Sequence, residues 1–193
     1  MLITEERLRQ RASLVEKAMK KSAGRILMEH AAIEDQAFDI FLSHSKADEE
    51  LILGAKELLE DDGFTVYVDW IQDPQLDRTK VTQETAAVLR ERMAQCGMLV
   101  YAHSLHSSTS TWMPWELGFF DGMKGKIAIL PIAASDELEF KGNEYLGLYP
   151  YLDHVPARGA TKPRFWVNRS YSVYANLDLW LRKNVQIQDR SPS

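Results

Sequence analysis

Apolar runs of strand length alternate along the chain with longer segments whose apolar residues recur every three to four positions. The strand-length runs lie at 38–43, 64–69, 98–102, 126–132 and 151–155. They are nearly continuous in apolar residues, as is typical of strands buried on both faces. The helical spacing is found at 48–62, 81–95, 115–123 and 170–183. This alternation predicts an α/β fold, with a parallel sheet and helices on both faces.

One more helix is predicted ahead of this alternation, over residues 4–26. Thr4 suits the N-cap, and Glu5 and Glu6 follow it where the helix dipole favours acidic side chains. Gly24 is expected to weaken or end this helix, which packs either on the domain or on a partner. The predicted organisation is an N-terminal helical extension over 1–30, a main domain over 37–183 and a flexible tail over 184–193.

Composition excludes several classes of protein. With 28 acidic and 23 basic residues the net charge is −5, so a nucleic-acid-coating protein is not expected. The single cysteine, Cys96, rules out an intrachain disulfide and a thiolate metal cluster. No apolar run approaches the ~20 residues that a membrane span needs, and mixed charge at the N-terminus argues against a signal peptide. We therefore expect a cytoplasmic protein that does not contact membranes.

The charge is distributed unevenly. Seven basic and four acidic residues lie in 1–30 (net +3), nine basic and 22 acidic in 31–157 (net −13), and seven basic and two acidic in 158–193 (net +5). A solvated surface would explain this pattern, and so would head-to-tail pairing between subunits.

Ligands in such sheets bind beyond the carboxyl ends of the strands, where the strand order switches direction. Two of the predicted ends carry Ser43 with His44, and His103 with Ser104. Glycine-rich signatures of a dinucleotide fold or a P-loop are missing from the sequence. His103 and His106 share one loop without a third ligand, so no metal site is expected.

Two tryptophans and one glutamate come together at the start of a predicted helix in segment 108–122. Pro114 suits the first helical position, which would put Glu116 in the first turn, where the helix dipole favours an ionised carboxylate. Trp112 and Trp115 offer flat faces beside it, so the group could receive a cationic aromatic ring carried on a sugar. Alternatively, Trp115 packs in the core and Glu116 is only a favourable first-turn acid.

Six motifs occur in order: FDIFLSHSKADEE, GFTVYVDW, an Asp-Pro loop, MLVYAHS, WMPWELG and IAILPI. Together they resemble a bacterial Toll/interleukin-1 receptor (TIR) domain of the NAD-cleaving type, similar to the Thoeris-like proteins of antiphage defence. WMPWE fits the W-x-x-x-E pattern of these domains, with Trp112 and Glu116 on its fixed positions. The resemblance covers 37–155 and implies a flavodoxin-like, five-stranded parallel sheet with its active site under the loop at 70–80. The N-terminal helix and a C-terminal helical extension lie outside it.

The activity that the resemblance implies is cleavage of the nicotinamide–ribose bond of NAD⁺, which is a substrate, so no cofactor is expected. Positive charge then develops on the ribose, as in glycoside hydrolysis, and Glu116 is the catalytic residue that stabilises it. Substrate contacts are expected from Trp112, Trp115, Ser43, His44 and Ser104. Attack by water would give ADP-ribose, attack within the molecule a cyclic isomer, and attack by another nucleophile a conjugate.

Two other functions stay open at this point. The chain could be a non-catalytic module that works by TIR–TIR association, or a nucleoside glycosyl-transfer enzyme, which would use the glutamate in the same way. Family members often act only when assembled, with a site completed by the neighbouring subunit. The resemblance therefore implies self-association, activity that depends on concentration, and a downstream effector that senses a nucleotide product.

Overall fold

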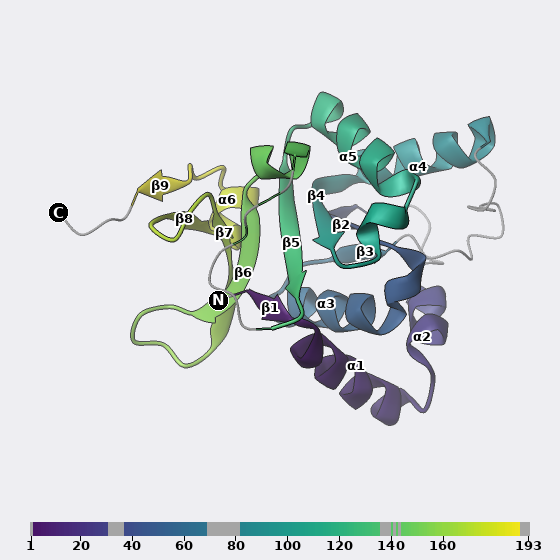
Figure 1. The fold of residues 1–193 in the computed structure, drawn as a ribbon, viewed down its shortest axis with the longest axis horizontal. Helices are drawn as coiled ribbons and strands as arrows, with labels where there is room; N and C mark the ends of the chain where they lie inside the picture. The colour runs from purple at the N-terminus through teal and green to yellow at the C-terminus, as the bar shows by residue number, and fades with distance from the viewer. Residues whose placement is uncertain are drawn as a thin grey trace.

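Helices cover both faces of a central sheet in the computed structural model (Figure 1). The structure describes residues 2–30, 37–68, 82–135, 140, 142 and 144–189. The loop at 70–80, which the resemblance places over the active site, lies outside the described residues.

Five parallel strands form the centre of the sheet, in the order β3-β2-β4-β5-β6. Their bounds are β2 Phe38–Ser43, β3 Val66–Val68, β4 Cys96–His103, β5 Ile127–Ala133 and β6 Tyr151–Pro156. The predicted five-stranded parallel sheet is thus confirmed. The chain runs from β2 to β3 on one side and then returns to β4 on the other. The direction of winding therefore switches between β2 and β4, which is where such sheets bind ligands.

Each face of the sheet has its own apolar layer, because side chains alternate along a strand. Ile40 and Leu42 point towards one layer, which includes apolar residues of α3. Phe41 points towards the opposite layer, which includes residues of α4 and α5. The helix bounds are α3 Glu49–Asp61, α4 Gln83–Gln95 and α5 Trp112–Met123. By the same alternation Ser43, two residues after Phe41, belongs to the α5 face.

The N-terminal segment is packed onto the sheet and onto α3. Strand β1 (Ile3–Thr4) pairs in parallel with the end of β5, and α1 (Glu5–Met19) lies along α3 (Figure 1). Thr4 is the predicted N-cap, and its hydroxyl accepts the Arg7 backbone N–H at 3.3 Å. Leu8 and Ala12 are completely buried in the layer shared with α3. Of the two expected arrangements, the segment packs on the domain.

The prediction of one continuous helix to residue 26 is wrong. Helix α1 ends at Met19, where Lys20 takes the left-handed conformation (φ 52°), and α2 (Ala23–His30) follows. The Glu16 carboxylate at the end of α1 accepts the Ala23 backbone N–H at 2.7 Å and so caps the second helix. Gly24, expected to end the first helix, instead lies in the second one.

Basic residues of the two ends pair with acidic residues of the middle within one chain. The pairs are Arg9 with Glu50, Arg11 with Glu57 and Asp61, Arg164 with Asp62, and Arg182 with Asp39. Several of the charges behind the uneven distribution are therefore matched internally. Each exposed pair contributes little stability, typically less than about 1 kcal/mol.

The predicted C-terminal helical extension is wrong in its first part. Antiparallel strands β7 (Pro163–Asn168) and β8 (Val173–Asn176) continue the sheet beyond β6, and α6 (Leu177–Arg182) is the only helix among the described residues that follow β6. Phe165 and Val167 alternate into the α3-side layer, which is the behaviour of a strand. Asn176 accepts the Leu179 N–H at 3.3 Å and starts the helix there. Within the predicted tail, β9 (Gln188–Asp189) pairs with β8.

Candidate active site

Glu116 lies completely buried behind the end of β2. Its Oε2 accepts a hydrogen bond of 2.6 Å from the Ser43 hydroxyl. Ser43 is the last residue of β2 and, by strand alternation, points to the face that α5 covers. A buried carboxylate is costly without such a partner, and a hydrogen bond to a charged group is among the stronger ones. The fold thus fixes one carboxylate at the carboxyl edge of the sheet.

Helix α5 starts two residues earlier than the sequence predicts, and this changes what holds Glu116. The helix begins at Trp112, so Pro114 is its third residue and Glu116 its fifth, beyond the first turn. Pro114 is still tolerated, because the first four N–H groups of a helix have no partner within the helix. The predicted first-turn position of Glu116 is therefore wrong. The Ser43 hydroxyl donates a hydrogen bond directly to this carboxylate.

The two tryptophans differ in their surroundings. Trp112 is buried and meets Trp115 edge to face, with ring centroids 5.5 Å apart. Trp115 is half-buried, stacks on Phe119 at 5.7 Å and has the Arg90 guanidinium 5.5 Å from its ring centre. Trp115 therefore packs against the apolar layer of α4 and α5 without being buried in the core. Substrate contact by either indole stays a prediction.

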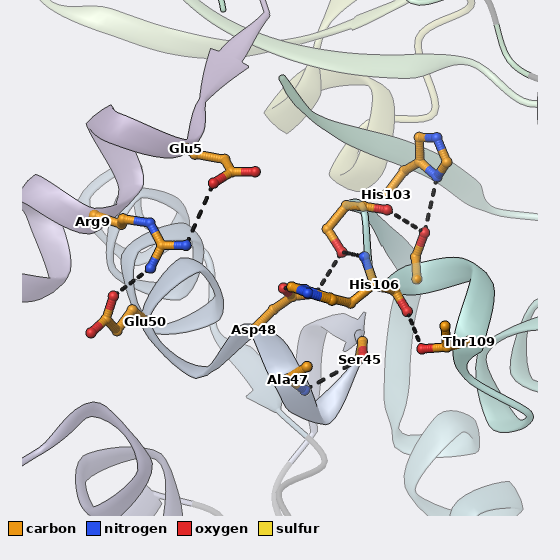
Figure 2. A network of polar contacts seen from close by, with 11 residues as sticks. Glu5, Arg9, Ser45, Ala47, Asp48, Glu50, His103, His106 and Thr109 are labelled. Carbon is orange, nitrogen blue, oxygen red and sulfur yellow. Dashed lines mark hydrogen bonds and ion pairs between the residues drawn. The ribbon is translucent and has the colours of Figure 1, made fainter. Parts of the chain in front are cut away.

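Ser104, at the end of β4, belongs to a second polar cluster (Figure 2). Its hydroxyl donates to Asp48 Oδ2 at 2.5 Å and accepts the His106 backbone N–H at 3.1 Å. The other Asp48 oxygen, Oδ1, lies 2.6 Å from His106 Nδ1. Asp48 is buried just before α3, whereas the His106 side chain is 54% exposed. We refer to Asp48, Ser104 and His106 as the Asp48 cluster.

Sequence reasoning did not identify Asp48, and it considered His106 only as a possible metal ligand together with His103. The signal in the sequence was weak, since Asp48 and His106 are 58 positions apart. His44 is buried beside Ser43 and its Nδ1 lies 3.0 Å from the Leu42 carbonyl oxygen, so its ring is also held in place.

Comparison with known proteins gives two relatives, while no family model matches the chain. Over 152 residues the chain is 49% identical to a protein named Probable 3' cyclic ADP-D-ribose synthase ThsB', from Bacillus cereus (strain MSX-D12). That match covers 78% of this chain and 79% of the relative. The chain belongs to the bacterial TIR family. A Putative cyclic ADP-D-ribose synthase TIR2 from Cytobacillus dafuensis is 30% identical over 109 residues, which are 56% of this chain and 28% of that protein.

In this TIR chain, two serine–carboxylate pairs flank the point where the strand order switches. Ser43 ends β2 and binds Glu116 of α5, while Ser104 follows β4 and binds Asp48 at the start of α3. The helices α5 and α3 cover opposite faces of the sheet (Figure 1). The edge between β2 and β4 is therefore polar and acidic on both sides, in the place where this fold type binds ligands.

Burial favours the neutral form of two side chains close to the TIR site, Tyr101 and His103. Burial raises the pKa of Tyr101 to about 12, and Tyr145 and Glu116 act in the same direction. Burial also lowers the pKa of His103.

Among the residues that the structure describes, no group of three or more His, Cys, Asp or Glu could hold a metal ion. Within the same residues, no helix has the length and apolar character of a membrane span.

Proposed function

We propose that this TIR chain cleaves the nicotinamide–ribose bond of NAD⁺ and closes the remaining ADP-ribose into a ring. The observation that carries the proposal is the Ser43–Glu116 pair, a fixed and fully buried carboxylate at the ligand-binding edge of the sheet. The names of the two relatives, both cyclic ADP-D-ribose synthases, support the same reaction.

The chemistry asks for one well-placed negative charge. As the C1–N bond breaks, its electron pair passes to the cationic nicotinamide ring, which leaves as a neutral molecule. Positive charge then appears on the ribose, as in glycoside hydrolysis. A carboxylate held by Ser43 in a buried position stabilises this charge without having to reorganise during the reaction. Glu116 is therefore assigned as the catalytic residue, with Trp112 and Trp115 beside the nicotinamide ribose.

The product is assigned from the choice of nucleophile. A hydroxyl of the same NAD⁺ molecule attacks the ribose carbon, so the ring is one water lighter than ADP-ribose. The name of the 49% identical relative favours a 3′ linkage for this chain as well. A diffusible cyclic nucleotide suits a signal, and we place the chain in bacterial antiviral defence with an effector that senses the product. No cofactor besides the substrate is needed.

Mass-resolved analysis of the products from purified full-length chain and NAD⁺ tests the proposal. Loss of one fixed transition-state stabiliser should slow nicotinamide release about 10²- to 10³-fold in Glu116→Gln. Glu91→Gln, which changes an exposed glutamate on the neighbouring helix α4, is the matched control and should keep the wild-type rate. Equal rates in the two variants would contradict the assignment of Glu116. A wild-type chain that releases no nicotinamide would favour the non-catalytic interaction module instead.

A further inference from the structure

The Asp48 cluster holds one imidazole in a defined orientation at the ligand-binding edge. His106 is fixed through its ring by Asp48 and through its backbone N–H by Ser104. The short 3₁₀ helix that follows, Ser107–Thr109, ties the loop further, because the Ser107 hydroxyl donates to the Ser104 carbonyl oxygen at 2.8 Å. A side chain that is 54% exposed would otherwise be free to rotate. Figure 2 shows the His106 ring directed at Asp48.

The partner of the ring decides which of its nitrogens can take up a proton. An ionised carboxylate only accepts hydrogen bonds, so His106 Nδ1 carries the hydrogen that points to Asp48 Oδ1. In the neutral ring, Nε2 is then the basic nitrogen. The negative charge of Asp48 also stabilises the protonated ring once Nε2 has accepted a proton. This is the arrangement of an oriented general base.

The two polar pairs lie at one edge of the sheet, on neighbouring strands. Ser43 is the last residue of β2 and is paired in register with Tyr101, three residues before Ser104. With a rise of about 3.3 Å per residue and about 4.8 Å between neighbouring strands, the backbones of Ser43 and Ser104 are on the order of 11 Å apart. A ribose that binds beyond this edge can therefore lie between Glu116 on one side and the Asp48 cluster on the other.

We propose that His106 accepts the proton of the hydroxyl that closes the ring. The inference rests on the proposed function. As the hydroxyl oxygen forms its bond to the ribose carbon, its proton passes to His106 Nε2 and from there to solvent, which reaches the exposed ring. Nicotinamide has by then left with the electron pair of the broken bond. Asp48 and Ser104 are positioning residues. His106 thus decides whether the cation is captured by the internal hydroxyl or by water.

The ratio of cyclic product to linear ADP-ribose tests this role, since it does not depend on how much enzyme is folded. In His106→Gln, nicotinamide release should continue within a few-fold of wild type. General-base assistance is worth about 10²- to 10⁴-fold, so the ratio should fall at least about tenfold as water captures the cation. Asp48→Asn removes the charge that stabilises the protonated ring and should shift the ratio the same way by a smaller factor. Glu91→Gln, which changes an exposed side chain of α4, is the control and should leave the ratio unchanged.

The outcomes separate the inference from the proposed function. A ratio in His106→Gln equal to that of wild type and Glu91→Gln overturns the role of His106, even if total turnover falls. Wild-type chain that gives no nicotinamide, or only linear ADP-ribose, overturns the proposed function itself. His106 is an exposed side chain, so its substitution leaves the core intact, and a thermal melt of each variant checks this.

Discussion

The contact between α1 and α3 predicts an unusual effect of adding one methyl group at Gly54. This glycine lies inside α3, and a Cβ built on it would be 2.1 Å from the Leu8 carbonyl oxygen and 2.7 Å from the Leu8 carbonyl carbon. Both are backbone atoms of α1, so no side chain can rotate away. In Gly54→Ala the two helices must therefore move apart by about 1 Å or more, since real Cβ contacts are rarely closer than 3.0 Å.

Two opposing free-energy changes set the sign of the effect. Alanine is a better helix former than glycine by about 1 kcal/mol, which on its own would stabilise Gly54→Ala. Separating α1 from α3 loosens Leu8 and Ala12, both completely buried. Burying one leucine side chain contributes about 1.5–3 kcal/mol, and overpacking of a tight contact costs a further 1–3 kcal/mol. We expect Gly54→Ala to lower the free energy of unfolding by about 1.5–5 kcal/mol.

Urea unfolding of full-length wild type, Gly54→Ala and Gly118→Ala measures this prediction. Gly118 also lies within a helix, α5, but a Cβ there would meet nothing within 4 Å. Gly118→Ala should therefore show only the propensity gain, up to about 1 kcal/mol. If Gly54→Ala were as stable as wild type or more so, α1 would not be packed on α3 as described, and the N-terminal segment would be a separate extension.

Three other perturbations have defined outcomes. Ser43→Ala removes the hydrogen bond to Glu116 and should slow nicotinamide release about 10- to 100-fold, since a bond to a charged group is worth about 1.5–3 kcal/mol. Ser170→Ala, in the turn between β7 and β8, is the control. Equal rates of the two variants would refute the role of Ser43. Burial, and after it the charge of Arg7, lowers the pKa of His154 from 6.5 to about 4. The neutral ring therefore contributes stability in full above pH 6.5, and this stability is lost as pH falls towards 4, by on the order of 2 kcal/mol after allowance for solvent screening. Urea unfolding at pH 7 and pH 4.5 should show a smaller decline of the free energy of unfolding in His154→Gln than in wild type. Finally, if the site is completed by a neighbouring subunit, nicotinamide release per chain should fall on dilution, and a constant rate down to the monomer, checked by light scattering, would contradict self-association.

Strand runs and helical spacing predicted the central sheet because local sequence largely determines both. A strand buried on two faces has few polar residues, and β2, β4 and β5 each show this in their own sequence. The C-terminal part could not be predicted in the same way. Strands β7 and β8 are only partly buried, and each ends in an asparagine, Asn168 or Asn176, so their apolar runs are short. They form strands because they pair in series, β7 with β6 and β8 with β7.

The individual site residues were predictable, but their contacts were not. Ser43 and Ser104 follow from the rule that strand ends bear ligand sites, and Glu116 follows from its motif. Which carboxylate each serine binds depends on the face of the sheet that each helix covers. The start of α5 shows the same limit. A proline fits anywhere in the first turn of a helix, so Pro114 did not determine that the helix begins two residues before it.

The proposed reaction explains why Glu116 is buried whereas His106, the group held by Asp48, is exposed. A charge that stabilises a developing cation is most effective where water is excluded, because the effective dielectric constant is lower there. Glu116 has no exposed surface and meets these conditions. A group that passes protons on must instead reach water, and the His106 side chain is half exposed while its supporting carboxylate, Asp48, is buried. Placing the two groups on opposite faces of one parallel sheet lets a single edge hold both environments, since each helix layer sets the burial of its own carboxylate.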